Sequence, residues 1–199
     1  ADWSMMELRA AAIISGDPKM LAALESGKDL HIQTAASVTG KPEKSINKSG
    51  SERNLAKALG FGLLYGMGAP AFQDYAANSY GVDMSLEQAT QHRSKYFRLY
   101  SGLRRWQGEQ SSASISTYSA STRYGRCVEC RKPDGSYHYT RSLNVPIQGS
   151  CADALHEALA RLPAALAGLD AHPVIIVHDE IILDTSEADA AVAAERLAD

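Results

Sequence analysis

Four side chains that recur at every fourth position, Arg53, Lys57, Phe61 and Tyr65, could together bind a nucleotide. Each step of four residues turns a helix by about 400°, so the set stays on one broad face about 18 Å long. Two cations one turn apart suit a triphosphate tail, and two aromatic rings further along suit a sugar and a base. The alternative is a surface helix whose aromatic residues only pack against the core.

Three glycines, Gly60, Gly62 and Gly66, lie beside these side chains. Each costs a helix interior ~1 kcal/mol relative to alanine. Glycine would be useful here if a flat ligand had to lie close to the backbone. A helix whose aromatic residues only pack against the core would not require these glycines, so the pattern favours a binding site.

A polar triplet, His178-Asp179-Glu180, separates two apolar, β-branched runs at 174–177 and 181–184. This pattern predicts a β-hairpin with the triplet at its tip. Carboxylates held by two strands are ligands that suit Mg²⁺, which takes few protein oxygens and leaves room for phosphates. The alternative is an ordinary polar turn, since acidic turns are common.

A second acidic segment lies at the start of the chain, where Asp2 precedes a predicted helix and Glu7 falls in its first turn. Capping and the helix dipole could explain both residues. Alternatively, Asp2 is the partner of Asp179, because two-metal catalysis needs carboxylates from separate segments that converge on ions about 4 Å apart.

Helices must position most of these groups. The spacing of apolar residues, and the glycines and prolines that end helices, predict helices at 5–15, 18–24, 29–38, 52–65, 71–80, 85–100, 103–116 and 150–162. The last of these is expected to break at Pro163, and a final helix is expected from about Ser186. A polar loop is expected at 41–51, and a β-ribbon with loops at 117–139. We therefore expect an α+β fold in which a small antiparallel sheet accompanies a mostly helical part.

Composition indicates an ordinary globular protein, with 45% hydrophobic and 22% charged residues and no apolar run long enough for a membrane span. The chain has three cysteines, which do not form the even-numbered set typical of a disulfide framework, and this favours a reducing, cytoplasmic setting. Cys127 and Cys130 resemble half of a zinc site, but no second pair exists, so zinc is not favoured.

Charge is unevenly distributed along the chain. Residues 41–141 carry 15 basic and 8 acidic side chains, a net charge of +7, whereas residues 1–40 sum to −2 and residues 142–199 to −8. A basic middle could follow a phosphate backbone while acidic flanks hold metal ions, or it could simply be a solvated surface.

These segments together resemble the family A DNA polymerases, the family of bacterial DNA polymerase I. Asp2-x-Ser4-x-x-Glu7-Leu8-Arg9 resembles motif A, Arg53-x3-Lys57-x3-Phe61-Gly62-x2-Tyr65-Gly66 resembles motif B of the fingers, and Val177-His178-Asp179-Glu180 resembles motif C. Four further segments follow the family's order: Asp29-Leu30-His31, Tyr96-Phe97-x2-Tyr100, Thr122-x2-Gly125-Arg126 and Arg141-x2-Asn144-x-Pro146-x-Gln148-Gly149. Met5 and Gly60 depart from the family's usual residues.

The resemblance implies a metal site with two Mg²⁺ ions. Asp2 and Asp179 would hold them, assisted by the backbone carbonyl of Trp3. Glu180 would be a supporting catalytic residue, and His178 would lie near the primer terminus.

The resemblance also implies a site for an incoming deoxynucleoside triphosphate. His31, Arg53 and Lys57 would bind its phosphates, with Lys57 as the proton donor to pyrophosphate. Phe61 would pack under the sugar, and Tyr65 would stand at the templating position.

Further roles concern sugar choice and DNA. Glu7 would block the space beside the sugar 2′ carbon, and Arg141, Asn144 and Gln148 would contact the primer–template duplex. The thumb and N-terminal parts of the parent polymerase would be further partners, and residues 1–199 alone would be weak or inactive.

By the same resemblance, residues 1–16 and 141–199 would form the palm, and residues 17–140 the fingers and the following ribbon. Two alternatives stay open. One is a fragment of a single-subunit phage-type RNA polymerase, which Glu7 and the Phe61-Gly62 pair disfavour. The other is a non-catalytic DNA-binding module built on the basic middle.

Overall fold

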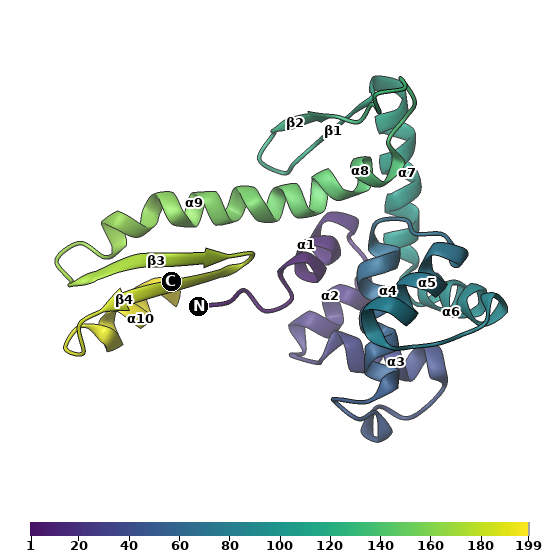
Figure 1. Ribbon diagram of the computed structural model, residues 1–199, viewed down its shortest axis with the longest axis horizontal. Coiled ribbons are helices and arrows are strands. Elements are labelled where there is room, and N and C mark those ends of the chain that lie inside the picture. The colour runs from purple at the N-terminus through teal and green to yellow at the C-terminus, as the bar shows by residue number, and fades with distance from the viewer. Residues whose placement is uncertain (199) are drawn as a thin grey trace.

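The computed structural model describes residues 1–198 and contains a helical body joined to an elongated arm (Figure 1). The body comprises α1 (Met6–Ser15), α2 (Pro18–Glu25), α3 (Leu30–Thr39), the short 3₁₀ helix η1 (Glu43–Ser45), α4 (Ser51–Leu64), α5 (Ala69–Tyr80), α6 (Leu86–Leu99) and α7 (Ser101–Thr117). The predicted helices of this part are confirmed to within a few residues at their ends.

Local capping explains where several helices begin and end. Asp17 and Asp29 accept hydrogen bonds from backbone N–H groups at the starts of α2 and α3, and Ser85 forms a capping box with Gln88 at the start of α6. Gly16 and Gly40 end α1 and α3 in the left-handed conformation, which glycine adopts without a steric cost.

One large core holds the body together. It joins apolar faces of α1 to α7 with the segment 143–147 and includes the fully buried side chains of Leu8, Met20, Leu59, Phe72 and Tyr96. Because α4 is buried on one face against α3 and α5, its opposite face is free to present polar side chains.

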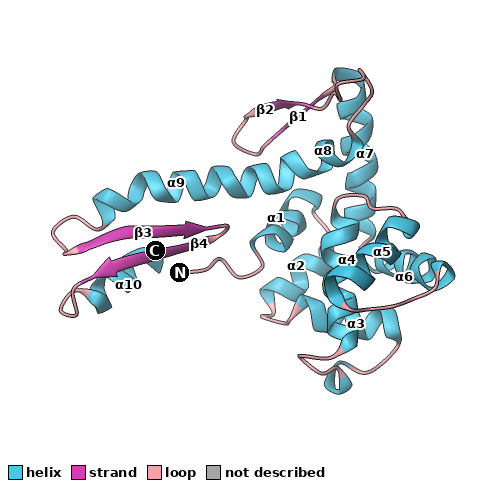
Figure 2. Ribbon diagram, in the orientation of Figure 1, coloured by secondary structure: helices cyan, strands magenta, loops and turns pink. Residues whose placement is uncertain are grey.

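A long helix connects the body to the arm (Figure 2). It begins as α8 (Tyr139–Asn144), passes through the π-helical turn η2 (Val145–Gly149) and continues as α9 (Ser150–Ala165). Pro146 supplies no N–H to the helical ladder, which is a sufficient reason for the irregular turn. The predicted break at Pro163 is wrong, since α9 continues to Ala165.

Two antiparallel sheets of two strands each complete the fold, so the α+β prediction is confirmed. β1 (Ser119–Ser121) pairs with β2 (Cys127–Glu129) within the predicted ribbon, and β3 (Ala171–Val177) pairs with β4 (Glu180–Thr185) as the predicted hairpin. The turn of this hairpin contains only His178 and Asp179 of the predicted triplet, because Glu180 is the first residue of β4.

The arm has its own small core, formed where α9 and α10 (Ala190–Ala198) pack with the hairpin. Helix α10 begins four residues later than Ser186, because Ser186 and Asp189 instead form a hydrogen-bonded turn. The 41–51 segment was predicted as loop but contains η1. The palm and fingers boundaries stay a prediction, since the core around α1 is continuous with that of α2 to α7.

Strand β3 exposes four consecutive apolar residues, Val174, Ile175, Ile176 and Val177, each between 46% and 53% accessible. Its outer edge pairs with no other strand in the described part of the chain. Within residues 1–198, no helix has the combination of length and apolar character that a membrane span needs.

Candidate functional site

The first residues of the chain lie along the open edge of β4. Ala1 N donates to the Ile181 carbonyl at 2.6 Å, Ile181 N donates back to Ala1 at 2.8 Å, and Trp3 N donates to the Asp179 carbonyl at 3.3 Å. Asp2 therefore forms a β-bridge with Glu180. This pairing brings two acidic segments together from opposite ends of the chain.

The three carboxylates of this region are not committed elsewhere. Asp2 and Glu180 are exposed and Asp179 is half-buried, and among residues 1–198 none of the three side chains forms a hydrogen bond or an ion pair. His178 has a φ of 54°, a left-handed conformation that turns the chain sharply just before Asp179.

These residues fit a hard cation by the chemistry of their donors, because free carboxylates and the Trp3 carbonyl are oxygen ligands. The Trp3 carbonyl also accepts a 3.0 Å hydrogen bond from Met6 N, which leaves one lone pair. In the described chain, no group of three or more histidine, cysteine, aspartate or glutamate side chains is arranged to hold a metal. A site here would therefore depend on two carboxylates, a backbone oxygen and groups from substrate.

A second group of predicted residues gathers on α4 and the start of α3. The ring of His31 lies 6.1 Å from that of Phe61 between centroids, and His31 is 6% exposed. Burial lowers the pKa of His31 to about 4; Asp29 opposes this shift, and the nearby charges of Arg53 and Lys57 add to it. His31 is therefore neutral at pH 7 and can act as a hydrogen-bonding group rather than a cation.

The two cations of this group differ in their partners. Arg53 donates from Nε and Nη2 to Asp29 Oδ2, at 3.2 and 3.0 Å. Lys57 is partly exposed and forms no hydrogen bond or ion pair within the described residues. Its ammonium is thus available to an anion.

Glu7 connects the body to the long helix. Tyr65 Oη donates to Glu7 Oε2 at 2.5 Å, and Gln148 Nε2 donates to Glu7 Oε1 at 2.8 Å. Asn144 in turn donates to Gln148. Burial raises the pKa of Tyr65, as does its bond to Glu7, so the phenol remains a donor.

Cys151 lies close to both acidic groups. Burial first, and then the negative charges of Glu7 and Asp179, raise the pKa of its thiol to about 11. Cys151 thus marks the place where the Glu7 network and the hairpin approach each other. Nothing in its sequence neighbourhood signals this position.

The glycine interpretation is wrong. A Cβ at Gly60 would meet Leu8 and His31, at 3.7 and 3.9 Å. One at Gly62 would meet Tyr75 at 3.2 Å, and one at Gly66 would overlap Tyr139 at 2.4 Å. The last two glycines therefore make room for neighbouring protein side chains, and none of the three lies against an open ligand space.

The predicted duplex contacts occupy two places. Asn144 and Gln148 are half-buried and bonded into the Glu7 network, whereas Arg141 and His178 are exposed. In Figure 1, helix α1 lies between α4 and the β3–β4 hairpin.

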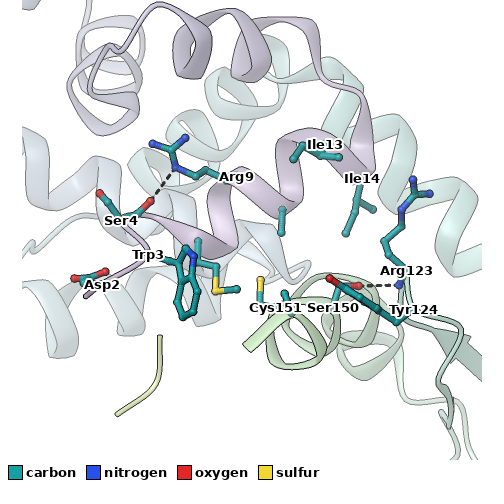
Figure 3. Close-up of a pocket in the computed structure, with 13 residues that line it drawn as sticks. Asp2, Trp3, Ser4, Arg9, Ile13, Ile14, Arg123, Tyr124, Ser150 and Cys151 are labelled. Carbon is teal, nitrogen blue, oxygen red and sulfur yellow. Dashed lines mark hydrogen bonds between the residues drawn. The ribbon is translucent and has the colours of Figure 1, made fainter. Parts of the chain in front are cut away.

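A cavity of about 590 Å³ lies between α1, α9 and the loop before β2. Asp2 and Trp3 line one side, and Arg123 and Tyr124 line the other (Figure 3). Its lining includes none of the cations or aromatic residues of α4. Of the predicted site, only the N-terminal segment reaches it.

Comparisons with known proteins agree with one another. The family model described as DNA polymerase family A matches residues 1–199. DNA polymerase I of Aquifex aeolicus is 38% identical over 188 residues, which cover 92% of this chain and 31% of that protein. The thermostable DNA polymerase I of Thermus aquaticus is 30% identical over 203 residues, covering 99% and 23%.

A solved structure gives the same result. The POL domain of Pol1 from M. smegmatis, in complex with DNA primer-template and dNTP, superposes with a TM-score of 0.87 at 27% identity, over 98% of this chain and 35% of that one. The chain thus spans about a third or less of each of these proteins.

Proposed function

Because this chain belongs to DNA polymerase family A, we propose that it forms the nucleotide-binding and metal-binding part of a template-directed DNA polymerase. The reaction would add a deoxynucleoside triphosphate to a primer 3′-OH and release pyrophosphate. The single observation that carries the proposal is the pairing of Asp2 with Glu180 of β4, the residue that follows Asp179.

The triphosphate would bind to the polar face of α4. Arg53 and Lys57 would contact the phosphate oxygens as charge-assisted donors, and neutral His31 would add a hydrogen bond. Lys57 has the freedom to give a proton to the departing pyrophosphate, since no group within the described residues holds its ammonium. Phe61 would support the sugar, next to His31.

Asp2 and Asp179, with the Trp3 carbonyl, would hold two Mg²⁺ ions, and Glu180 would support them. When bound, these ions would make the primer hydroxyl more acidic and neutralise charge on the leaving group. The chain's own contribution would be geometric: the backbone pairing of residues 1–3 with residues 179–181 would hold the two acidic segments together, and the turn at His178 would direct that residue toward the primer terminus.

Glu7 would exclude a ribose 2′-OH, and Tyr65 would fix the position of Glu7 through their 2.5 Å hydrogen bond. Asn144 and Gln148 adjoin the same network, so they would reach the nascent base pair, and exposed Arg141 would contact the DNA backbone. Template pairing would supply the sequence information.

The remaining thumb and N-terminal parts of the parent polymerase would be the partners of this chain. Strand β3 exposes apolar side chains, and a monomer rarely leaves such a strand in contact with solvent. We therefore infer that other parts of the parent polymerase cover β3. Neither a phage-type RNA polymerase nor a non-catalytic module finds support in the comparisons.

The decisive experiment replaces Asp179 by asparagine in the parent polymerase and measures Mg²⁺-dependent primer extension and duplex binding. We expect extension to fall by at least a thousandfold while duplex affinity changes less than threefold. Asp184→Asn, in the same hairpin, is the matched control and should keep near-normal extension. If Asp179→Asn extends primers normally, the metal site is misassigned.

A further inference from the structure

Asp29 uses its two carboxylate oxygens for different tasks. Oδ1 accepts backbone hydrogen bonds from His31 N at 2.9 Å and Ile32 N at 3.2 Å, and so caps α3. Oδ2 accepts only from Arg53, through Nε and Nη2. The capping role is complete without the second oxygen, so the bond to Arg53 calls for a separate explanation.

The Arg53 guanidinium is held along one edge. Nε and Nη2 are occupied, and Nη1 forms no hydrogen bond within residues 1–198. A planar guanidinium fixed at one edge has a fixed orientation for its remaining donors. Asp29 therefore determines where the free donors of Arg53 point.

The ion pair is shielded enough to be persistent. The side chains of Arg53 and Asp29 are 22% and 29% exposed. The mean exposure of the two partners is lower in this pair than in any other ion pair of the described residues. Burial opposes ionisation of Asp29, but bonds from Arg53 and from the start of α3 together lower its pKa, so it is charged at neutral pH. Solvent screening still limits the strength of the pair.

The neighbourhood contains few other charges that could orient Arg53. His31 is neutral at pH 7, Lys57 repels the guanidinium, and no other carboxylate among residues 1–198 bonds to Arg53. Arg53 and Asp29 are 24 residues apart in sequence, so the pair also fixes α4 against the start of α3, where His31 lies.

We propose that Asp29 is a positioning residue for triphosphate binding, which orients Arg53 so that its free Nη1 faces the phosphates of the incoming nucleotide. This inference rests on the proposed function of Arg53. It differs from a competitive role, in which Asp29 would have to release Arg53 before the phosphates bind. The two roles predict opposite signs for the effect of removing the charge.

Asp29→Asn is the informative variant, because asparagine also caps helices and keeps the Oδ1 bonds. In the parent polymerase we expect the KM for dNTP to rise about tenfold, with kcat within twofold and Tm within a few degrees. The matched control is Glu52→Gln, which removes one negative charge from the residue next to Arg53 and should change KM less than twofold.

A double-mutant cycle with Arg53→Ala separates positioning from structural support. We expect Asp29→Asn to raise KM no further once Arg53 is absent, whereas a purely structural role would give additive effects. Binding of inorganic tripolyphosphate, measured by calorimetry, should weaken about tenfold in Asp29→Asn and stay unchanged in Glu52→Gln.

Each other outcome has a definite meaning. A lower KM in Asp29→Asn would establish the competitive role and overturn ours, and additive effects or an unchanged KM would also overturn it. If Arg53→Ala itself leaves KM and tripolyphosphate binding unchanged, the triphosphate assignment fails, and the positioning role fails with it.

Discussion

At the scale of single residues, Glu7 connects three parts of the chain through its two oxygens. One accepts from Tyr65, just after the end of α4, and the other from Gln148 in η2. A carboxylate with both oxygens bonded cannot move aside without leaving polar partners unsatisfied. This rigidity is what a residue that excludes a 2′-OH would need.

Glu7→Ala tests that role in the parent polymerase. Removing the side chain opens space beside the sugar, so we expect ribonucleotide incorporation relative to deoxynucleotide to rise about tenfold or more. Glu7→Gln keeps the volume and an acceptor for Tyr65 and should retain most of the discrimination. Competing rNTP and dNTP extension assays measure both, and unchanged sugar selection in Glu7→Ala would contradict the prediction.

His31 makes stability depend on pH. Its pKa is lowered to about 4 in the folded chain, against an ordinary value of 6.5, so the unfolded chain binds the proton more readily. Stability is therefore full above pH 6.5 and falls as pH drops toward 4, by roughly 3 kcal/mol in all.

Urea unfolding of wild type and His31→Gln at pH 7.5 and 4 measures this contribution. We expect the variant to lose less stability than wild type on acidification. An equal loss in both proteins would show that His31 does not titrate differently on folding.

At the scale of elements, Asp17 joins the starts of two helices. Its Oδ1 accepts from Lys19 N and Met20 N in α2, and its Oδ2 accepts from Gly102 N at 2.8 Å and Leu103 N at 3.2 Å in α7. The side chain is buried, and a Cβ at Gly102 would lie 2.7 Å from the Asp17 backbone. Close helix approach thus depends on this pair of residues.

Asp17→Ala should destabilise the chain by about 3–5 kcal/mol, because four N–H groups lose their acceptor and two belong to a buried helix start. Ser85→Ala removes the exposed cap of α6 and should cost about 1 kcal/mol. Urea denaturation of both variants gives the comparison. Similar losses would mean that α7 does not depend on Asp17.

For some helices, residues close to the helix start are enough to predict the boundary from the sequence. The boundaries of α2, α3 and α6 follow from an acid or serine cap near the start, and each is visible in the sequence. The continuation of α9 through Pro163 is not visible, because a proline usually ends a helix, whereas here the last turn still closes with a 2.9 Å bond from Leu166 N to the Leu162 carbonyl.

At the scale of the whole molecule, the hairpin leaves an unbroken run of apolar side chains exposed on β3. Ile175 and Ile182 are paired across the strands, and both are exposed. Ile181, on the other face, is buried in the core of the arm. The Ile175–Ile182 face is thus open to association, and the other face is packed at β4 but not at β3, where Ile176 is 49% exposed.

Residues 1–199 studied alone should therefore self-associate. We expect Ile175→Thr with Ile182→Thr, which keeps β-branched residues, to give a smaller sedimenting species at about 50 µM. Ile13→Thr, at an exposed position on α1, should leave sedimentation unchanged. A wild-type chain that sediments as a monomer would contradict this.

The sequence by itself determined most helices of the body, the hairpin, the α+β class and the family resemblance, because caps, breakers and apolar periods act within a few residues. It also indicated that Asp2, Glu7, Arg53 and Asp179 could do chemistry. It did not reveal what Gly62 and Gly66 face, since their neighbours come from other elements.

Only the tertiary structure decided which of these groups meet. The bond from Gln148 to Glu7 spans 141 residues, and the bond from Ala1 to Ile181 spans 180. Such contacts depend on how whole helices and strands pack around two cores, and no local spacing encodes them. The double use of Asp29, as a helix cap and as the partner of Arg53, became visible for the same reason.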